Sequence, residues 1–401
     1  MPLDPLYPAA RIAMMLEDAH AAAVVTTAEL VNTLSTGTAS PTLVLIDSAA
    51  DAIAAQAATD LEVTAEERTT RGDHPLYVIF TSGSTGRPKG VQIGHAAMVS
   101  FLASFEASLG VTAKDAFCAV TTVCFDIATL ELYLPLTVGA KVVLARRDEA
   151  GCPVQLAALL RTHAVSLLQA TPATYRMLAR DGWAGAPASL TALCGGEPLP
   201  AGLRDELVPK VKALWNVYGP TETTVWSTCC LLARDGVQTT AGTGVPIGTP
   251  VANTSVYVLD EKKQLVPLGL PGELWIGGKG LSAGYLGRDD LTCERFVTCP
   301  FEPAGGRMYG TGDLVRWNPH SLQLECLGRL DHQVKIRGFR IELGEIETCL
   351  AAQRAVDQVV VDARPSEDGK RLVAYIVLAE NEVRRCPSLT RFERLRLSLQ
   401  A

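Results

Sequence analysis

Residues 77–91, Tyr-Val-Ile-Phe-Thr-Ser-Gly-Ser-Thr-Gly-Arg-Pro-Lys-Gly-Val, constrain the fold of this chain more than any other stretch. The first four residues, 77–80, are apolar and β-prone, which predicts a buried strand. The loop that follows carries a hydroxyl group or a glycine at nearly every position and ends with the cations Arg87 and Lys89. Glycines allow the positive φ angles that an anion-cradling loop needs, so the composition suits a polyphosphate.

The same loop could be an ordinary exposed turn, because Gly and Ser favour turns in all proteins. Its density of donors, between a strand and a helix predicted over 95–109, favours phosphate binding instead. It is not a P-loop, because Lys89 is followed by Gly90 and the glycine spacing differs. It is not a dinucleotide fingerprint either, because Gly83 and Gly86 leave no Gly-x-Gly pair.

Composition bounds the class of protein. With 401 residues, 48% of them hydrophobic and 20% charged, the chain is long enough for two or more globular domains. Its net charge of −7 argues against nucleic acid or an anionic membrane as the main partner. We find no apolar segment that could span a bilayer and no signal-peptide core. The eleven cysteines show no Cys-x-x-Cys or zinc spacing, which predicts reduced thiols in a cytoplasmic protein.

The order of apolar runs predicts an α/β fold with parallel sheets. Strands are expected at 24–25, 43–46, 77–80, 141–145, 164–168, 190–193 and 213–217, with helical segments between them. From Gly248 the chain becomes Gly- and Pro-punctuated β structure, which predicts a barrel-like subdomain. Beyond residue 330 we expect a hairpin over 333–341 with its turn at Gly338, a helix over 343–352, and strands at 356–361 and 372–378.

Two further positions carry polar groups suited to a ligand. Asp126 lies between apolar neighbours at a predicted strand-to-helix junction, where it could simply cap the helix. A buried carboxylate needs a partner, however, and a substrate ammonium group would supply one. After the strand at 213–217, Tyr218 offers a stacking face for adenine, Thr221 a hydroxyl for the α-phosphate, and Glu222 a hard oxygen ligand for Mg²⁺. The same residues could form a plain turn, but ligands bind at the carboxyl ends of parallel strands.

The loop at 77–91 resembles the phosphate loop of adenylate-forming enzymes, which include acyl-CoA synthetases, luciferases and the adenylation domains of nonribosomal peptide synthetases. Further motifs follow in order: Pro-Leu-Asp-Pro-Leu-Tyr-Pro at 2–8, Asn-Val-Tyr-Gly-Pro-Thr-Glu at 216–222, Tyr-Gly-Thr-Gly-Asp at 309–313, and the segment 327–347. The chain is similar to a peptide-synthetase adenylation domain over residues 1–378. The resemblance implies a large AMP-binding core over 1–330 that lacks its first stretch, and a small, incomplete α+β domain over 331–401 with an atypical tail at 380–401.

The resemblance also implies an activity, cofactors and partners. The reaction would be the ATP- and Mg²⁺-dependent activation of an amino acid as aminoacyl-AMP, with release of pyrophosphate. A phosphopantetheine thiol on a peptidyl carrier protein would then take the acyl group, next to a condensation domain, in secondary metabolite biosynthesis. Neither nucleic acid nor membrane would be a partner.

Site residues carry over from the motifs. Lys89 and the loop hydroxyls would hold the β- and γ-phosphates, Glu222 the Mg²⁺ ion, and Asp313 the ribose, while Asp331 would be the hinge. The expected catalytic residues are Lys89, Thr221, Glu222 and Arg329, and the expected ATP- or AMP-binding residues are Thr81, Ser82, Gly83, Ser84, Thr85, Gly86, Gly196, Glu197, Asn216, Tyr218, Gly219, Asp313 and Arg329.

The resemblance likewise defines an amino-acid pocket. Its expected residues are Asp126, Ile127, Leu130, Gln169, Leu193, Gly195, Val217, Val225 and Trp226. An aspartate at the position of Asp126 holds the substrate's α-amine in the peptide-synthetase branch. The other side chains except Gln169 are apolar, and Trp226 is bulky, so the set is similar to pockets that select glycine, with alanine or another small residue next. Trp226 could instead be a plain core residue.

The chain departs from the family pattern at both ends. The family's C-terminal catalytic lysine motif has no counterpart, because no lysine follows Lys370. Since a lost transition-state cation costs several orders of magnitude in rate, we expect ATP binding with weak or absent turnover. Two alternatives stay open: an acyl- or aryl-CoA ligase of the same superfamily, and a catalytically silent ATP-binding fragment.

Overall fold

The computed structural model describes residues 1–31, 34, 37, 39–59, 72–83, 86–239, 244–302, 305–331, 333–336, 338–366 and 369–379. Contacts divide the chain into two compact units, Met1–Thr81 with Pro88–Asp331, and Ser82–Arg87 with His332–Ala401. The predicted phosphate loop is therefore shared between the units. The predictions for Ser84, Thr85 and the tail at 380–401 lie outside the described residues.

The first unit is built on an eight-stranded sheet, which confirms the predicted α/β class. Its strands run in the order β11-β10-β9-β8-β7-β5-β6, with β12 also paired to β10. Neighbours from β6 to β9 are parallel, and β10 runs antiparallel to β9. The bounds are β5 Ala116–Ala119, β6 Lys141–Leu144, β7 Leu167–Ala170, β8 Ala186–Cys194, β9 Val211–Tyr218, β10 Thr228–Arg234, β11 Val237–Gln238 and β12 Thr249–Pro250.

Strands β5, β10, β11 and β12 were not among the predicted strands, and β7 is displaced from its prediction. The strand expected at 164–168 begins instead at Leu167. Ala164 adopts a left-handed backbone with φ of 49°, which an extended strand does not tolerate. The local apolar run was therefore recognised, but its first residues belong to the turn after a helix.

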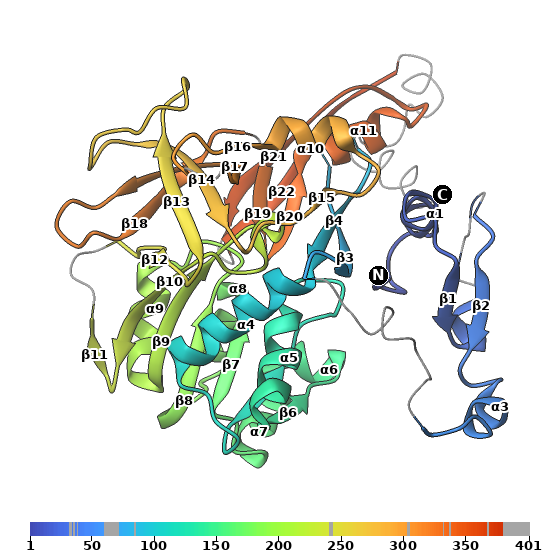
Figure 1. Cartoon of the computed structure of the whole chain (residues 1–401), viewed down its shortest axis with the longest axis horizontal. Coiled ribbons are helices and arrows are strands. Elements are labelled where there is room, and N and C mark those ends of the chain that lie inside the picture. Colours follow the sequence, from blue (N-terminus) through green and yellow to red (C-terminus); the bar gives the residue numbers. More distant parts are fainter. Residues whose placement is uncertain are drawn as a thin grey trace, which may run out of the picture. The chain divides into compact units, whose positions relative to one another are not determined.

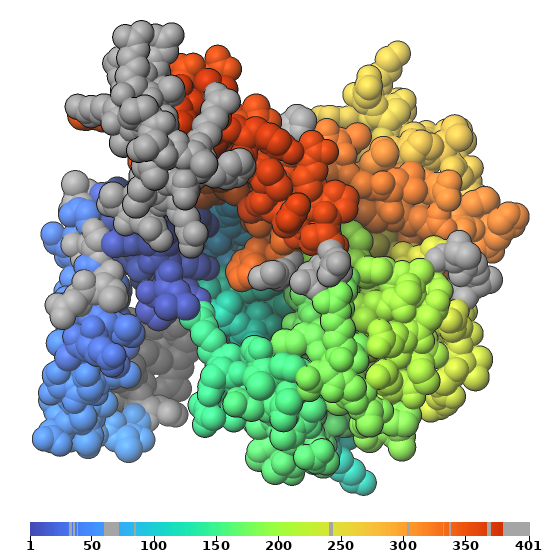
Figure 2. Space-filling model, turned by 180° about the vertical axis from the view of Figure 1, so that it is seen from behind, coloured from blue at the N-terminus to red at the C-terminus, as the bar shows by residue number. Residues whose placement is uncertain are grey.

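Helices cover both faces of this sheet, as Figure 1 shows. Helices α4 (His95–Leu109) and α5 (Ala128–Val138) bury residues such as Phe105 and Leu134 against one face. Helices α7 (Pro153–Thr162), α8 (Pro172–Arg180) and α9 (Ala201–Leu207) bury residues such as Leu156 and Tyr175 against the other, and this green face is seen in Figure 2. Each large apolar side chain so buried contributes about 1.5–3 kcal/mol. The short helix α6 (Arg147–Ala150) and the 3₁₀ turn η1 (Val208–Lys210) complete this layer.

Two antiparallel sheets accompany it. The first, β15-β4-β3, pairs β3 (Pro75–Thr81) with β4 (Lys89–Gly94) and β4 with β15 (Gly284–Tyr285). The sequence did not predict β4, which lies between the loop and helix α4. The second has the order β13-β14-β17-β16, with β18 paired to β17, and realises the β structure expected after Gly248. Its elements are β13 Thr254–Leu259, β14 Gly272–Gly278, α10 Asp289–Arg295, β16 Phe296–Thr298, β17 Arg307–Trp317 and β18 Leu324–Arg329.

The first residues form a small parallel pair, β1 (Ala23–Thr26) with β2 (Thr42–Leu45), as predicted. Helix α1 (Ala9–Asp18) packs Ile12 and Leu16 with Val24 of β1. Short helices α2 (Ala28–Val31) and α3 (Ala50–Ala54) flank β2 in sequence. No helix in the described part of the chain has both the length and the apolar character needed to cross a bilayer.

The described residues of the second unit form two hairpins and a helix. Strands β19 (Gln333–Ile336) and β20 (Phe339–Glu342) pair around Gly338, whose φ of 81° is the left-handed conformation that favours glycine. Helix α11 (Leu343–Ala351) follows, and β21 (Val356–Ser366) pairs with β22 (Gly369–Leu378). The hydroxyl of Ser82 donates to the carbonyl of Arg340 at 2.8 Å, which ties the loop's first residues to this unit.

Candidate active site

The predicted site residues of the first unit gather where the parallel strands end. Asp126 lies in the segment after β5 and Gly195 directly after β8, while Gln169 lies near the end of β7 and Tyr218 is the last residue of β9. Since the carboxyl ends of parallel strands share one edge, this is where an α/β sheet binds ligands.

The segment after β9 has a strained backbone. Thr224 and Val225 both adopt left-handed φ angles, of 62° and 65°, which β-branched residues rarely do. Such conformations cost about 1–3 kcal/mol each and persist where surrounding contacts impose them. Here the Thr224 hydroxyl donates to the carbonyl of Gly280 at 2.7 Å. A side chain on Gly219 would lie 2.3 Å from the carbonyl of Val225, so this tight path needs a glycine there.

Lys89, Tyr285 and Glu222 form a buried cluster beside this segment. Lys89 Nζ lies 3.3 Å from Glu222 Oε1, with side-chain exposures of 10% and 0%. The Tyr285 hydroxyl donates to the same Oε1 at 2.8 Å and accepts from Lys89 Nζ at 3.3 Å. The ammonium group also lies 4.7 Å from the centre of the Tyr285 ring, within cation–π range. The structure thus joins the predicted phosphate-binding cation and the predicted metal ligand through a tyrosine that the sequence did not suggest.

The strand register places Thr81 opposite Lys89. The hydroxyl oxygen of Thr81 is buried and has no hydrogen-bond partner in the described part of the chain. A buried hydroxyl without a partner suits a ligand oxygen such as that of a phosphate. Ser82 and Gly83 belong to the second unit, as does Gly86, whose φ is 80°.

The residues present fit a Mg²⁺ ion that is held mainly by a substrate. No group of three or more Asp, Glu, His or Cys side chains that could hold a metal occurs among the described residues. Mg²⁺ in nucleotide enzymes is commonly bound by one or two carboxylates and the phosphates. Glu222 supplies such a carboxylate, so a metal here would depend on the nucleotide.

A second polar network connects Tyr218, Asp313 and Arg329. The Tyr218 hydroxyl donates to Asp313 Oδ2 at 2.5 Å, and Arg329 Nη1 donates to Oδ1 at 3.0 Å. Burial, followed by the charge of Asp313, raises the pKa of Tyr218 well above its ordinary value, so the phenol stays a donor. Arg329 also binds Asp331 through Nε at 2.6 Å and Nη2 at 2.7 Å, and donates to the carbonyl of Thr311 at 3.1 Å. The predicted ribose and hinge residues are therefore one connected network.

The remaining predicted nucleotide residues lie near these segments. Asn216 is buried on β9, and its amide donates to the carbonyl of Pro246 at 2.8 Å. Thr221 begins the 3₁₀ turn η2 (Thr221–Thr223) and is buried. Gly196, with φ of 85°, and the partly exposed Glu197 follow β8. The Asn216 side-chain amide therefore already donates to the backbone of the protein.

The predicted pocket residues come together in one buried cluster. Ile127, Leu130, Leu193, Val217, Val225 and Trp226 all belong to it. A side chain on Gly195 would lie 2.7 Å from the Trp226 ring and 2.6 Å from the carbonyl of Val217, so these three are in close contact. Trp226 is only 2% exposed. The volume around Gly195 is therefore already filled by the indole.

Asp126 is 2% exposed and lies beside this cluster. The helix N-cap is Ile127 rather than Asp126. The buried Tyr77 hydroxyl has no hydrogen-bond partner in the described residues. Burial raises the pKa of Tyr77 well above its ordinary value, and the charges of Asp126 and Tyr133 add to this. A neutral phenol therefore lies near the predicted amine-binding carboxylate.

The side-chain amide of Gln169, a predicted pocket residue, is held by three hydrogen bonds. Its Nε2 donates to the carbonyl of Ile127 at 2.7 Å and to Glu131 Oε1 at 3.0 Å, and its Oε1 accepts from Trp226 Nε1 at 2.7 Å. The sequence did not suggest Tyr285 or Glu131 as site residues, because their partners are distant in the chain, and it gave Tyr77 only as the start of a buried strand.

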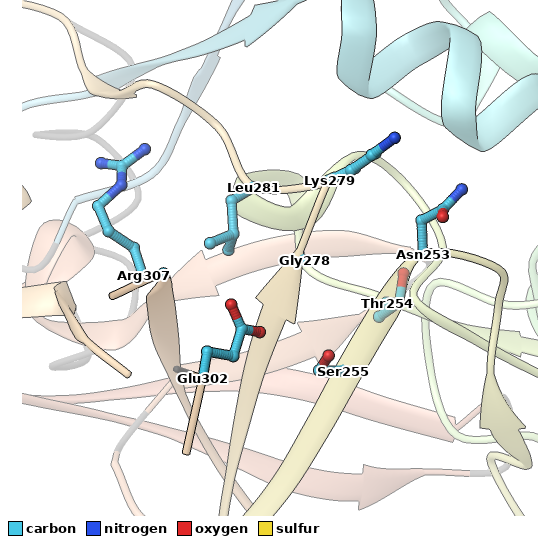
Figure 3. Close-up of a pocket in the computed structure, with 9 residues that line it drawn as sticks. Asn253, Thr254, Ser255, Gly278, Lys279, Leu281, Glu302 and Arg307 are labelled. Carbon is cyan, nitrogen blue, oxygen red and sulfur yellow. The ribbon is translucent and has the colours of Figure 1, made fainter. Parts of the chain in front are cut away.

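A separate open hollow occurs at the end of β13 and β14. Figure 3 shows Asn253, Lys279, Glu302 and Arg307 around it. Arg307 donates to the carbonyls of Ser282 and Ala283 at 3.0 and 3.3 Å, so its guanidinium group is hydrogen-bonded to the backbone. None of the predicted site residues lines this hollow.

A parallel sheet covered by helices on both faces is the fold that the resemblance to adenylate-forming enzymes predicts. A family model described as "AMP-binding enzyme" matches residues 1–286, and the chain belongs to this family. This confirms the family and the fold that the sequence predicted.

The chain is similar to segments of much longer peptide synthetases. It is 44% identical over 382 residues to a dimodular nonribosomal peptide synthase of Bacillus subtilis (strain 168), covering 94% of this chain and 15% of the relative. It is 40% identical over 384 residues to tyrocidine synthase 3 of Brevibacillus parabrevis, covering 95% of this chain and 6% of the relative. The chain thus spans only a small part of these relatives. Its predicted place among amino-acid-adenylating ligases is confirmed.

Solved structures agree. The crystal structure of a four-domain nonribosomal peptide synthetase bound to AMP and glycine superposes with a TM-score of 0.70 at 41% identity, covering 94% of this chain and 27% of that chain. A synthetase protein with adenylation and carrier domains, bound to a vinylsulfonamide inhibitor, gives a TM-score of 0.79 at 26% identity and covers 94% of this chain and 63% of that chain.

Proposed function

We propose that this chain activates a small amino acid, glycine in the first place and otherwise alanine or another small residue, as aminoacyl-AMP. The observation that carries the proposal is the segment 217–226. It supplies Val217, Val225 and Trp226 to the apolar pocket, and Tyr218 and Glu222 to the two polar networks. One short segment therefore serves both an amino-acid pocket and a nucleotide site.

The reaction would join the two substrates at the α-phosphorus. A carboxylate oxygen of the amino acid attacks the α-phosphorus of ATP, and the bond to the bridging oxygen breaks, so pyrophosphate leaves with that electron pair. Positioning and charge neutralisation supply most of the catalysis in such transfers. Lys89 would neutralise phosphate charge, and Thr221 would donate to the α-phosphate. Glu222 would hold Mg²⁺, which would supply charge neutralisation at the phosphates.

The Tyr218–Asp313–Arg329 network would bind the nucleoside. Asp313 can accept from two adjacent ribose hydroxyls, and Arg329 holds that carboxylate in place at 3.0 Å. The Tyr218 ring would lie against adenine, next to Gly196, Glu197 and Asn216. Thr81, with its buried hydroxyl, and the residues Ser82, Gly83, Ser84, Thr85 and Gly86 would contact the β- and γ-phosphates, and Asp331 would be the hinge.

The pocket favours glycine on steric and electrostatic grounds. Asp126 would pair with the α-ammonium group, since a buried carboxylate is stabilised by an opposite charge. The fully buried Trp226 and the contact around Gly195 leave little room for a side chain. The bound glycine in the 41% identical synthetase structure supports this choice.

The product would pass to a partner. We propose that a phosphopantetheine thiol of a peptidyl carrier domain accepts the aminoacyl group, as the multidomain relatives suggest, and that a condensation domain uses it in nonribosomal peptide synthesis. A cytoplasmic location is part of this proposal and is supported by the free state of the ten described cysteines. We expect neither nucleic acid nor membrane among the partners.

Pyrophosphate exchange tests the proposed function. The purified chain is incubated with ATP, Mg²⁺, labelled pyrophosphate and one acid at a time from a panel of glycine, alanine, larger amino acids, fatty acids and aryl acids. We expect slow exchange that depends on glycine and, less strongly, on alanine, because no lysine follows Lys370. Exchange driven only by fatty or aryl acids would instead identify an acyl- or aryl-CoA ligase, and ATP binding without any exchange would identify a silent ATP-binding protein.

A further inference from the structure

Glu131 is a buried carboxylate beneath the amino-acid pocket. It lies on α5, five residues after Asp126, and is fully buried. Its Oε2 accepts from the backbone N–H groups of Val120 and Thr121 at 2.9 and 3.0 Å. Its Oε1 accepts from the Thr121 hydroxyl at 2.7 Å and from Gln169 Nε2 at 3.0 Å. Four donors thus converge on one carboxylate that the family resemblance did not mark.

These bonds anchor the loop that carries Asp126. The loop leaves β5 at Val120 and enters α5 after Ile127, so Glu131 fastens its first residues. Gln169 fastens its last residue through the carbonyl of Ile127 at 2.7 Å. Because both ends are held by one connected pair of side chains, the position of Asp126 depends on that pair.

The same bonds determine the orientation of the Gln169 amide and, through it, of Trp226. An indole N–H can only donate, so Gln169 must present its oxygen to Trp226, at 2.7 Å. Its NH₂ group then faces two acceptors, the carbonyl of Ile127 and Glu131 Oε1. A flipped amide would place donor against donor at Trp226 and acceptor against acceptor at Glu131. The network therefore allows one arrangement.

We propose that Glu131 is a positioning residue for the amino-acid pocket, anchoring the Asp126 loop through Thr121 and orienting Trp226 through Gln169. The proposal rests on the proposed function only in taking Asp126 and Trp226 as pocket residues. Glu131 touches no substrate in this account and acts through its neighbours.

The substitution Glu131→Gln tests the proposal with little change in volume. It turns one acceptor oxygen into a donor, which then opposes the donors of Thr121 or Gln169. A matched control is Glu325→Gln, which alters a carboxylate that accepts from Arg316 and Asn318 on the antiparallel sheet. Circular dichroism and thermal melting establish that each variant is folded.

An activity-independent readout comes from the indole N–H signals in a ¹H–¹⁵N spectrum. The chain has five tryptophans, so the spectrum has five such signals, and Trp226→Phe identifies one of them. We expect Glu131→Gln to shift the Trp226 signal and to speed its exchange with D₂O at least tenfold. The signal of Trp275, whose indole nitrogen is buried without a partner in the described residues, should not move. An unmoved Trp226 signal in folded Glu131→Gln protein overturns the proposal.

Kinetics give the second readout. We expect Glu131→Gln to raise KM for glycine at least fivefold and to change KM for ATP less than twofold. If Glu131→Gln only reduced the fraction of folded protein, the active fraction would fall while KM for glycine and KM for ATP stayed unchanged. That result would contradict a positioning role. The double variant with Trp226→Phe should raise KM for glycine by less than the product of the two single fold-increases, because both substitutions act through Gln169. If the wild-type chain shows no exchange, the proposed function fails while the indole signals still decide the role of Glu131.

Discussion

Removal of the Tyr285 hydroxyl is the most specific change that can be made to the Lys89–Tyr285–Glu222 cluster of the proposed nucleotide site. Tyr285→Phe removes the donor to Glu222 at 2.8 Å and the acceptor for Lys89 at 3.3 Å. The ring and its cation–π contact with Lys89 remain. The substitution therefore isolates one oxygen that orients the predicted metal-binding carboxylate.

The expected loss in kcat/KM follows from the two hydrogen bonds that the Tyr285 hydroxyl makes with Glu222 and Lys89. A hydrogen bond to a charged group contributes about 1.5–3 kcal/mol, and the longer Lys89 contact adds less than about 1 kcal/mol. A loss of about 2–3 kcal/mol at the transition state lowers kcat/KM for MgATP by about 30- to 150-fold. KM for glycine should change little, because Tyr285 belongs to a different hydrophobic cluster from the pocket residues.

The assay is pyrophosphate exchange at varied MgATP with saturating glycine. Tyr257→Phe is the matched control, because it removes a phenol that donates to Glu302 at 3.4 Å on a different sheet; its kcat/KM should stay within twofold of wild type. A folded Tyr285→Phe protein with kcat/KM for MgATP within threefold of wild type would refute the role given to the Lys89–Tyr285–Glu222 cluster.

Three further predictions concern the pocket, the buried acid and the ribose site. Trp226→Leu should raise the ratio of kcat/KM for alanine to kcat/KM for glycine about tenfold or more, because space for one more carbon atom in a pocket changes discrimination by about 1–3 kcal/mol. An unchanged ratio in exchange assays would contradict the pocket assignment. Burial raises the pKa of Glu131 to about 7, from an ordinary 4.5, and its titratable neighbours Cys118 and Tyr175 also have raised pKa values. Folding therefore favours the protonated acid, so the free energy of unfolding of the wild type should fall by up to roughly 3 kcal/mol relative to that of Glu131→Gln as pH rises from about 4.5 to about 7. A difference between the two proteins in denaturant melts that does not change with pH would show that the pKa of this carboxyl is not shifted. Asp313→Asn should raise KM for ATP at least tenfold with little effect on KM for glycine, since one hydrogen bond to a charged group contributes about 1.5–3 kcal/mol; equal changes in both constants would argue against a ribose contact.

Much of the scaffold could be predicted because its signals are local. Helix α4 has the predicted bounds, His95–Leu109, because an apolar helical run ends at Gly110, whose φ is 65°. The hairpin around Gly338 was likewise predicted from alternation and one glycine. These patterns depend on residues that are neighbours in sequence, so one sequence is enough to find them.

The parts that could not be predicted depend on distant partners. Strand β15 has only two residues, and Tyr285 reaches the site because it pairs opposite Val91 of β4. Glu131 looks like an ordinary helical glutamate until Gln169 and Thr121 are placed beside it. Pairing across such separations leaves no periodic or compositional trace, so motifs could suggest some members of the candidate site but could not suggest these two.

If one site takes both ATP and a small amino acid, it should bind a bisubstrate analogue, and this binding is the most direct test. Glycyl-sulfamoyl-adenosine carries the nucleoside and the amine in a single molecule, and calorimetry measures its Kd without requiring turnover. We expect tight binding to the wild-type chain, weakened at least tenfold by Asp126→Asn and, separately, by Asp313→Asn. Binding that either substitution leaves unchanged would contradict a shared site.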